Sequence, residues 1–510
     1  MSRRERAAWV ALLAVALALR LASLGDRPPH HDEAVHAHFA DELLSRGVYR
    51  YDPTYHGPLL FYVTAPVFAV FGQSPATVRL YPALAGTLLV ALPLLLRRRV
   101  GAGTAWWCGV LLAISPTFLY YSRFGRNDVP VALFTAAAMV FFLRARRGGW
   151  KWIPWAGVMA GLHAISKETF YVTLPLVTAA SAAVALHGGV AASVARAWRW
   201  LTSNAVAVAV AALWFVSLCV TAYTFVFIHP EDVLFPVKAI RYWAQQHAVQ
   251  RVGGPWTYHF PRLALYEFLP LAAAVALAVR RWSRLRRIEV FCLAWGVSAI
   301  ALYAYLGEKV PWLLAHQVLP FVLPAAAELR RTFSAQGRWA GRALAALALV
   351  ATAWSASAVT YRYPTIEPDD THAELLVFVQ TTREFGELAR EGLELQAAKG
   401  EEHVATVAGE ASWPLSWQWR RLPVWWELPK ANTHPRVVVC DPVDDPIVAT
   451  RLGTAYERRH VRLRAWWVER WDGVGPAAVL DWFVTRRAWS GRGSTDVSVF
   501  EPQRVEREGQ

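Results

Sequence analysis

Cysteine, methionine and charge are scarce in this chain of 510 residues, which has 4 Cys, 3 Met and only 18% charged residues. Four cysteines are too few for a scaffold built on disulfide bonds. A hydrophobic content of 55% excludes a chain that is mostly disordered, because disordered chains are poor in apolar residues. The sequence also lacks a glycine-rich phosphate loop, zinc-type Cys/His spacing and a serine elbow, so it is not a Walker-type pump.

Long apolar runs are what the sequence has in abundance. Residues 1–360 hold 49 of the 91 Asp, Glu, Lys and Arg residues, and residues 361–510 hold the other 42 in less than half that length. We therefore expect a mainly α, polytopic membrane domain over residues 1–360, with about eleven runs near the ~20 residues that cross a bilayer core. The runs are roughly 7–24, 76–96, 103–121, 129–144, 152–166, 168–186, 203–228, 263–279, 289–306, 312–327 and 342–360.

Two apolar segments at the start of the chain need separate interpretation. The stretch 58–72 is expected to be a helix that lies at the membrane surface. The first run has the basic start of a signal peptide, with Arg3, Arg4 and Arg6. Its apolar part is long for such a peptide and no clear small-residue cleavage site precedes Asp26, so we expect a retained first helix.

The formal net charge of +15 and the pI of about 9.9 suggest, taken alone, an anionic partner such as nucleic acid. Sorting the charges by loop changes this interpretation. The N-terminus and five alternate loops hold 21 Lys and Arg against three acidic residues. This alternation predicts that these segments are cytoplasmic and that the chain resides in the cytoplasmic membrane, with no nucleic-acid partner. With eleven spans, the tail from about residue 361 lies outside the cytoplasm.

The tail, residues 361–510, has the composition of a small α/β domain. Short β-like runs at 404–407, 437–440 and 497–500 alternate with helical stretches such as 370–397. Its many tryptophans are expected in the domain core and at the membrane interface, and a platform for sugar rings is the second alternative. Cys440 is alone in the tail and the other cysteines fall in helices, so no disulfide is expected.

The first outer loop, within residues 25–75, carries adjacent carboxylates. Asp32 and Glu33 follow His30 and His31 and precede apolar residues at helical spacing, which places them near a helix N-terminus. One carboxylate can act as a general base toward a hydroxyl. Both, with His31, can instead hold a divalent metal such as Mg²⁺ or Mn²⁺. The third alternative is an acidic cluster that only the helix dipole favours.

Two further outer segments carry polar groups next to the membrane. Tyr55 and His56 precede a Gly-Pro turn, where His56 either lines a polar pocket or is structural. The second outer loop, only a few residues long, forces together Arg123, Arg126 and Asp128. Arginine suits bidentate binding of phosphate, and the alternative is an internal Arg–Asp pair that ties two helices together.

A lysine and a glutamate also meet in each of two later outer segments. They are Lys167 with Glu168, and Glu308 with Lys309, the second pair followed by Trp312. A salt bridge is the simple explanation for each pair. Four outer loops with such groups indicate one shared cavity, which would fit a lipid-borne phosphate and a hydroxyl acceptor. The aromatic, basic loop 229–262 is a candidate lid without a specific motif.

Taken in order, these motifs resemble the GT-C superfamily of membrane glycosyltransferases, which use polyprenyl-phosphate sugars. Within that superfamily, the motifs are most similar in kind to those of protein O-mannosyltransferases and the lipid A aminoarabinose transferase. The pattern also resembles a prokaryotic family described as flippase-activity-associated. The shared segments are His56–Leu60, Ser122–Asp128 and Gly307–Trp312, and the resemblance covers roughly residues 7–330.

The resemblance implies roles for individual residues. Asp32 matches the first-loop aspartate that acts as catalytic base or, in the oligosaccharyltransferase branch, as metal ligand. Glu33 matches its acidic neighbour, and Asp128 the second acidic position. The basic residues of the later loops become candidates for binding the donor phosphate, and the remaining polar residues line the pocket. The phosphate candidates are Arg123, Arg126, Lys167 and Lys309, and the pocket candidates are His31, His56, Tyr55, Glu168, Glu308 and Trp312.

The sequence thus predicts a GT-C transmembrane domain followed by a small extracytoplasmic α/β domain. The expected activity is transfer of a sugar from a polyprenyl-phosphate donor to a glycan or protein acceptor, with inversion and with Asp32 as the base. The alternative is a non-catalytic partner of the same fold that assists flipping or presentation of lipid-linked glycans, and a pure transporter ranks third.

Overall fold

The computed structural model describes residues 1–146, 149–249, 253–335, 337, 339–395, 403–431 and 433–503. The chain divides into two compact units. The first, the transmembrane unit, comprises residues 1–24, 46–72 and 76–362. The second, the C-terminal unit, comprises residues 25–45, 73–75 and 363–510, so the first-loop segment that carries Asp32 clusters with the C-terminal domain.

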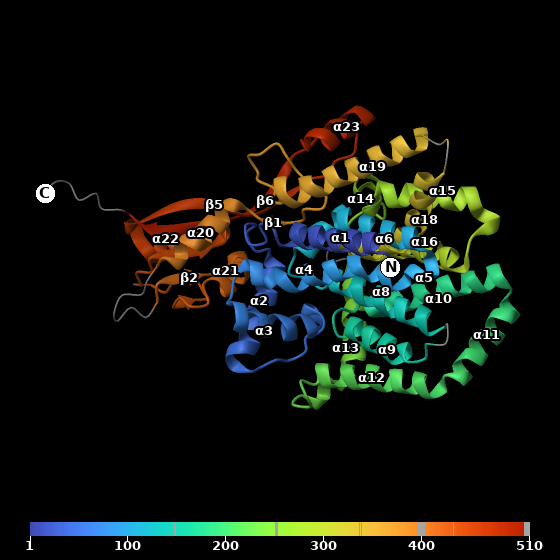
Figure 1. Ribbon diagram of the computed structural model, residues 1–510. Coiled ribbons are helices and arrows are strands. Elements are labelled where there is room, and N and C mark those ends of the chain that lie inside the picture. Colours follow the sequence, from blue (N-terminus) through green and yellow to red (C-terminus); the bar gives the residue numbers. More distant parts are fainter. Residues whose placement is uncertain are drawn as a thin grey trace. The chain divides into compact units, whose positions relative to one another are not determined.

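The transmembrane unit is helical (Figure 1). Its helices are α1 (Arg3–Leu21), α3 (Leu59–Phe71), α4 (Pro75–Ala91), α5 (Arg97–Val100), α6 (Ala102–Ile114), α7 (Pro116–Ser122), α8 (Asp128–Ala145), α9 (Trp152–Ala164), α10 (Thr169–Gly188), α11 (Val190–Ser203), α12 (Ala205–Tyr223), α13 (Phe235–Val249), α14 (His259–Tyr266), α15 (Phe268–Arg281), α16 (Arg287–Tyr305), α17 (Leu314–Val318), α18 (Val322–Ser334) and α19 (Trp339–Ser357).

Among the described residues, seven helices are long and apolar enough to cross a membrane, and up to nine if each of two bent pairs counts as one span. The bent pairs are α6 with α7, at 58°, and α14 with α15, at 87°. The chain is therefore a multi-span membrane protein, but the predicted count of eleven is not confirmed. The two runs that fall short are 7–24 and 152–166, because α1 carries several charged residues and α9 has only 13 residues.

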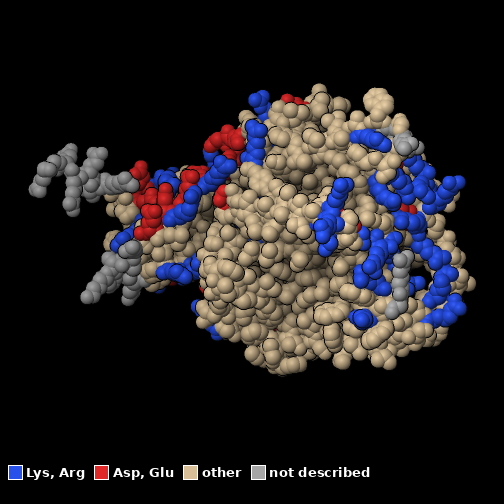
Figure 2. Space-filling view, viewed as in Figure 1, with Lys and Arg blue, Asp and Glu red and all other residues tan. Residues whose placement is uncertain are grey.

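Basic side chains gather at one end of the transmembrane helices. Figure 2 shows Lys and Arg near the ends of α5, α10, α11 and α15, beside a broad uncharged surface. Arg97, Arg98 and Arg99 are the first three residues of the short helix α5, and Arg280 and Arg281 end α15. An uncharged surface flanked by basic ends is what a lipid-embedded helix bundle requires.

The two bent spans meet at a buried carboxylate. Pro116 has no N–H to continue α6, so the chain breaks there and the Ser115 hydroxyl accepts from Phe118 N–H at 3.2 Å to begin α7. Glu267, which separates α14 from α15, accepts from Ser115 Oγ at 2.6 Å and from Thr117 N–H at 3.0 Å. One carboxylate thereby ties both bends together and sets the direction in which α7 leads to Asp128.

The C-terminal unit contains a six-stranded sheet of order β1-β5-β6-β4-β2-β3, in which β2 is parallel to β3 and β4 and the other neighbours are antiparallel. The small sheet domain predicted from the tail is therefore present. The strands are β1 (Gln380–Thr381), β2 (Ala405–Val407), β3 (Val424–Trp425), β4 (Val437–Cys440), β5 (Tyr456–Trp467) and β6 (Arg492–Pro502). The helices are α2 (His31–Arg46), α20 (Arg383–Leu393), α21 (Ser412–Gln418), α22 (Asp445–Leu452) and α23 (Pro476–Thr485).

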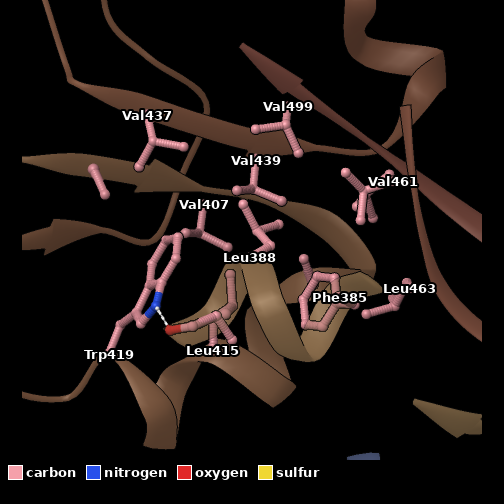
Figure 3. Packing of buried hydrophobic residues seen from close by; sticks show 14 residues of the cluster. Phe385, Leu388, Val407, Leu415, Trp419, Val437, Val439, Val461, Leu463 and Val499 are labelled. Atoms are coloured by element: carbon pink, nitrogen blue, oxygen red, sulfur yellow. Dashed lines mark hydrogen bonds between the residues drawn. The ribbon is translucent and has the colours of Figure 1, made fainter. Parts of the chain in front are cut away.

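One face of this sheet is covered by α20 and α21 (Figure 3). Phe385 and Leu388 of α20 and Leu415 of α21 pack against the inward valines of the central strands. Trp419 is fully buried there, and its indole N–H donates to Ala389 O at 2.9 Å. The predicted placement of tryptophans in the domain core therefore holds for Trp419.

The expectation of a helix over 370–397 is wrong for its first part, and residues 396–397 lie outside the described residues. Gln380 and Thr381 form β1, which pairs with β5. The helix α20 begins only after Thr382, whose hydroxyl accepts from Phe385 N–H at 3.2 Å as its N-cap. A cap of this kind stops a helix from extending toward the N-terminus.

The first-loop segment is anchored to the start of the C-terminal domain. Thr381 Oγ1 donates to Pro29 O at 2.7 Å, and Gln380 Nε2 donates to Pro28 O at 3.0 Å. His30 Nε2 lies 3.2 Å from Phe378 O. These contacts fix the chain immediately before Asp32, so the C-terminal domain positions the candidate catalytic loop.

Candidate functional site

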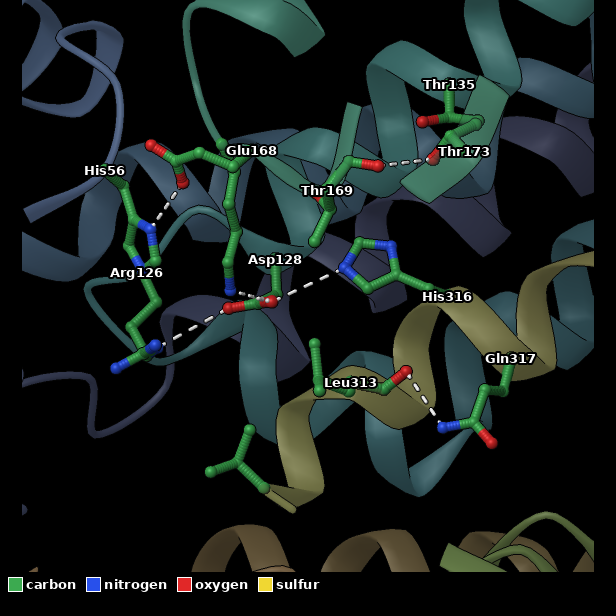
Figure 4. A network of polar contacts seen from close by, with 12 residues as sticks. His56, Arg126, Asp128, Thr135, Glu168, Thr169, Thr173, Leu313, His316 and Gln317 are labelled. Atoms are coloured by element: carbon green, nitrogen blue, oxygen red, sulfur yellow. Dashed lines mark hydrogen bonds and ion pairs between the residues drawn. The ribbon is translucent and has the colours of Figure 1, made fainter. Parts of the chain in front are cut away.

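The polar centre of the transmembrane unit is built around Asp128, the first residue of α8 (Figure 4). Its carboxylate lies 2.7 Å from Lys167 Nζ, 3.5 Å from Arg126 Nε and 3.4 Å from His316 Nε2. All four side chains are at most 8% exposed. Two permanent cations face one carboxylate, so the buried cluster carries an excess of positive charge before any protonation of His316.

Local structure explains how these groups converge. Arg126 lies in the tight turn between α7 and α8, and its guanidinium stacks on Trp312 with the carbon 3.8 Å from the ring centroid. Lys167 follows α9, where its N–H donates to His163 O at 3.1 Å. His316 lies on the short helix α17, and its ring stacks on Tyr303 of α16.

A second buried pair lies one residue further along the chain from Lys167. Glu168 Oε2 is 2.8 Å from His56 Nδ1, and the His56 ring stacks on Trp243 of α13, with centroids 5.4 Å apart and planes 7° from parallel. Adjacent residues 167 and 168 thus serve two neighbouring ion pairs. Both His56 and Glu168 are buried.

Gly57 allows this second pair to form. The Gly57 N–H donates to Ser166 O at 3.2 Å, and the Leu59 N–H donates to Ile165 O at 3.0 Å. A Cβ at residue 57 would lie 2.2 Å from Ile165 O, a distance that no side chain tolerates. The Gly in the His-Gly-Pro segment is therefore required for the two loops to approach, and this approach places His56 beside Glu168.

Two of the four cations predicted to bind phosphate donate hydrogen bonds to main-chain carbonyls instead. Arg123 donates to Leu19, Arg20, Ala22 and Ser23 carbonyls and stacks on Tyr361, which ties the end of α1 to α7. Lys309 donates to the carbonyls of Tyr303, Ala304 and Leu306 at the C-terminus of α16. A cation at that position satisfies orphan carbonyls and complements the helix dipole. Burial lowers the pKa of the Lys309 ammonium.

Three further predicted pocket residues are Tyr55, Glu308 and Trp312. Tyr55 ends the short helix Pro53–Tyr55 and is half-buried, and burial together with Asp52 raises the pKa of its hydroxyl. Glu308 is half-buried beside Lys309. Trp312 is buried and reaches the cluster through Arg126.

The first-loop carboxylates, in the C-terminal unit, differ sharply from each other. Glu33 is 1% exposed and accepts from His30 N–H at 2.9 Å and from Arg27 at 3.4 Å, so it closes the N-terminus of α2. Asp32 is 30% exposed; its N–H donates to His30 Nδ1 at 3.0 Å, and its carboxylate lies 3.8 Å from the same nitrogen. Asp32 is therefore the more exposed of the two carboxylates.

No group of three or more His, Cys, Asp or Glu side chains in the described part of the chain is arranged to hold a metal ion. His31, Asp32 and Glu33 all belong to that described part. The carboxylate of Glu33 is already used within α2, which leaves Asp32 and His31 as the remaining metal candidates.

Sequence reasoning overlooked His316 and Trp243 as site residues. The position of His316 one turn after Trp312 was a usable signal, because i and i+4 residues share a helix face. Trp243 gave no such signal, since nothing near it in the long loop 229–262 forms a motif, and only the tertiary packing of α13 brings it to His56.

Comparison with known proteins agrees with this architecture. Residues 55–217 match the model of a family described as dolichyl-phosphate-mannose-protein mannosyltransferase. The structure is similar to that of ArnT from Cupriavidus metallidurans bound to undecaprenyl phosphate, with a TM-score of 0.61 and 18% identity, over 96% of this chain and 97% of that chain. The apo state of that ArnT gives a TM-score of 0.58 and 17% identity, over the same shares of both chains.

The similarity at this identity establishes the fold. The chain has the GT-C fold, and the superfamily resemblance drawn from the sequence motifs is confirmed at that level. The finer resemblance to the flippase-activity-associated family stays a prediction. No curated protein matches the chain by sequence comparison.

Proposed function

We propose that this GT-C-fold membrane protein is an inverting glycosyltransferase that uses a polyprenyl-phosphate sugar on the extracytoplasmic face of the cytoplasmic membrane. The observation that carries the proposal is the buried cluster around Asp128, in which Arg126 and Lys167 leave positive charge in excess. A buried, preorganised excess of positive charge suits an anionic phosphate that gains charge as a bond to it breaks.

In the proposed reaction, Asp32 accepts the proton of an acceptor hydroxyl. The acceptor oxygen attacks the anomeric carbon as the bond from that carbon to the phosphate oxygen breaks, and the electron pair leaves with the polyprenyl phosphate. Arg126 and Lys167 stabilise this leaving group. Asp128 holds both cations in place and is not itself the base, because its carboxylate already faces three positively charged or protonatable groups.

The fit of a divalent metal rests on Asp32 and His31 alone within the first loop, and two ligands do not make a closed site. If a metal binds there, it would polarise the acceptor hydroxyl or the phosphate. No step above depends on it. The acceptor is a hydroxyl of a glycan, a lipid-linked glycan or a protein.

The test is transfer from radiolabelled undecaprenyl-phosphate sugars to a panel of acceptors, with the purified protein in liposomes. Asp32→Asn is expected to lower turnover about 100-fold or more, as loss of a general base does. Asp26→Asn is the matched control, because Asp26 is exposed in the same segment. Wild-type turnover in a correctly folded Asp32→Asn variant contradicts the role of Asp32.

A deletion strain separates transfer from the alternative role in flipping. Lipid-linked glycans that are short by one sugar support the transferase. Complete glycans held on the cytoplasmic leaflet support the non-catalytic flipping partner and overturn the proposed activity.

A further inference from the structure

The connection between α15 and α16 is strongly basic. Residues 280–287 contain five arginines and no acidic residue, and Arg330 and Arg331 lie near the end of α18. The nearest acidic residues in the sequence are Glu289 and Glu328. Figure 2 shows Lys and Arg over this end of the bundle. The alternation of basic loops along the chain explains the sign of this excess charge, but not how the guanidinium groups are arranged.

Two glutamates hold three of these arginines in a row. Glu289 Oε1 accepts from Arg286 Nη2 at 2.8 Å and lies 3.8 Å from Arg331 Nη2. The other terminal nitrogen of Arg331, Nη1, lies 3.9 Å from Glu328 Oε2. Glu328 also accepts a hydrogen bond from Arg280. The three guanidinium groups therefore belong to one continuous chain of ion pairs, which crosses the ends of α15, α16 and α18.

The carboxylates of this row are buried, whereas the guanidinium groups reach the surface. The side chains of Glu289 and Glu328 are 0% and 7% exposed. Those of Arg280, Arg286 and Arg331, which we call the arginine cluster, are 58%, 43% and 32% exposed. Each guanidinium group carries five N–H donors, so three of them have more donors than two carboxylates accept. The arginine cluster therefore presents hydrogen-bond donors and positive charge to an anion at the surface.

The packing of the loop keeps the arginine cluster in place. Leu285 is buried and packs with Leu277 of α15 and Ala327 of α18. The Arg286 N–H donates to Glu289 Oε2 at 2.8 Å and closes the N-terminus of α16. Donors that are fixed before a ligand binds lose less conformational entropy on binding than flexible side chains do. This fixed arrangement favours a defined binding site over diffuse attraction of anions.

The position of the arginine cluster favours a phosphate of the lipid surface. Two candidate membrane spans, Arg287–Tyr305 and Pro311–Ser334, have one end at this cluster, and the bent pair of α14 and α15 ends in the same loop. The ends of spans lie among lipid headgroups, where tryptophan side chains also gather. Trp282, in the loop, is 76% exposed. Arginines beside such a tryptophan match a phospholipid whose headgroup carries net negative charge.

The arginine cluster is separate from the candidate active site. The helix α16 begins at Arg287 and carries Tyr303, on which His316 of the Asp128 cluster stacks. The interval from residue 287 to residue 303 corresponds to about 24 Å of helix. A phosphate at the arginine cluster is therefore a different one from the donor phosphate proposed for the Asp128 cluster.

We propose that Arg280, Arg286 and Arg331 form a binding site for the phosphate of an anionic phospholipid. Two free oxygens of a phosphodiester can each accept from a neighbouring guanidinium group, and such charge-assisted hydrogen bonds are the strong ones. Glu289 and Glu328 are positioning residues, because they hold the arginines from the buried side. The proposal does not depend on the proposed glycosyl transfer.

The experiment titrates the full-length protein in detergent with phosphatidylglycerol or phosphatidylcholine and counts bound lipids by native mass spectrometry. We expect phosphatidylglycerol to bind about 10-fold more tightly than the zwitterionic lipid, because only the former has net charge for the cluster to attract. Arg286→Gln should weaken phosphatidylglycerol about 10-fold, the effect of one lost charged hydrogen bond, and leave phosphatidylcholine unchanged. Arg286→Lys should fall between the two, since it keeps the charge but loses the planar fork.

Arg199→Gln is the matched control. Arg199 is exposed on α11 and carries the same charge at the same basic end of the bundle. It lies about 15 Å along the helix from Gly189, at the start of α11, and that exceeds the range of a screened charge. We therefore expect phosphatidylglycerol to bind Arg199→Gln as it binds the wild type.

A second measurement keeps the test valid if Arg286→Gln is less stable, since Arg286 also caps α16. The quantity compared is the rise in melting temperature that phosphatidylglycerol produces, because a ligand that binds only the folded state stabilises it. The rise should be several degrees in the wild type and in Arg199→Gln. It should be largely lost in Arg286→Gln and in Arg280→Gln, whatever their melting temperatures without lipid.

Three outcomes overturn the proposal. Equal weakening in Arg199→Gln and Arg286→Gln would mean that only the overall charge of this end attracts the lipid. Equal affinity of the wild type for the two lipids would exclude recognition of an anionic headgroup. Displacement of phosphatidylglycerol by millimolar inorganic phosphate or glycerol phosphate would show a site for soluble phosphates instead of a lipid. None of these measurements involves turnover, so failure of the proposed glycosyl transfer is recognised separately.

Discussion

Lys167 Nζ lies 2.7 Å from Asp128 Oδ1, and both side chains are almost entirely buried. Burying a charge is costly unless an opposite charge accompanies it, so each of these two buried charges stabilises the other. The lysine and the aspartate come from loops that are 39 positions apart in the sequence. The pair therefore joins the end of α9 to the start of α8 and fixes the site between them.

We expect Lys167→Met to destabilise the protein by roughly 3 kcal/mol, because removing one partner of a buried pair leaves the other charge uncompensated. Lys167→Arg should retain most of the stability, since the positive charge remains. Thermal unfolding monitored by tryptophan fluorescence measures both. A Lys167→Met variant as stable as the wild type would show that Arg126 and His316 suffice to hold Asp128.

Arg126 and Lys309 should respond differently to the same substitution. We expect Arg126→Met to weaken donor phosphate binding and to lower turnover about 100-fold, as loss of one fixed cation at a developing negative charge does. Lys309→Met should lower the melting temperature, because three carbonyls of α16 lose their donor, but should leave donor KM unchanged. Kinetic constants for the two variants, measured side by side, decide the assignment. A raised donor KM in Lys309→Met would show that Lys309 does bind the donor phosphate.

The anchor of the first loop predicts a long-range effect on catalysis. Thr381→Val removes the hydroxyl that donates to Pro29 O, three positions before Asp32. We expect a fall in kcat of about tenfold, because a base displaced by a fraction of an ångström loses much of its effect. Thr450→Val is the control, since its hydroxyl serves only its own exposed helix. Equal kcat in both variants would show that other contacts hold the loop.

The raised pKa of Glu367 predicts that replacing this residue with glutamine stabilises the protein at neutral pH but not at acidic pH. Burial raises the pKa of this carboxyl above its ordinary value of 4.5, and hydrogen bonds from Thr365 and Arg383 offset only part of the effect. The folded protein then binds a proton more tightly than the unfolded chain, so stability falls as the pH rises from the unfolded pKa through the folded one. Glu367→Gln should therefore melt like the wild type near pH 4 and higher than the wild type near pH 7.

Melting curves of Glu367→Gln between pH 4 and pH 8 check this expectation. Glu387→Gln is the control, because Glu387 is 64% exposed on α20. A difference from the wild type that is the same at every pH would mean that the charge of Glu367 is not its cause.

The cysteines should be unreactive in the folded protein. All four are buried, and burial together with nearby aspartates raises the pKa of Cys440 to about 12. Only the thiolate is a good nucleophile, so alkylation at pH 8 should be slow until the protein unfolds. Mass spectrometry after iodoacetamide treatment measures it. Rapid labelling of Cys440 in the folded state would show that the sheet of the C-terminal domain opens locally.

Local patterns account for much that was correctly predicted. Apolar runs identified the membrane helices, because the length of a span follows from the thickness of a bilayer. The β-like runs at 404–407 and 437–440 became β2 and β4, since consecutive buried valines favour strands. The twelve-residue strand β5 was not foreseen, because its many arginines hide the alternation and only pairing with β6 stabilises it.

By itself, the sequence determined the membrane class, the α/β tail and the residues that carry the polar chemistry, because hydropathy and motif spacing are local properties. Tertiary structure decided which of those residues act together. Arg126 and Lys167 meet Asp128, whereas Arg123 and Lys309 are taken up by carbonyls at helix ends. It also joined the segment of Asp32 to the C-terminal unit. The physical reason is that a cation finds its partner through packing between distant helices, which no local pattern specifies.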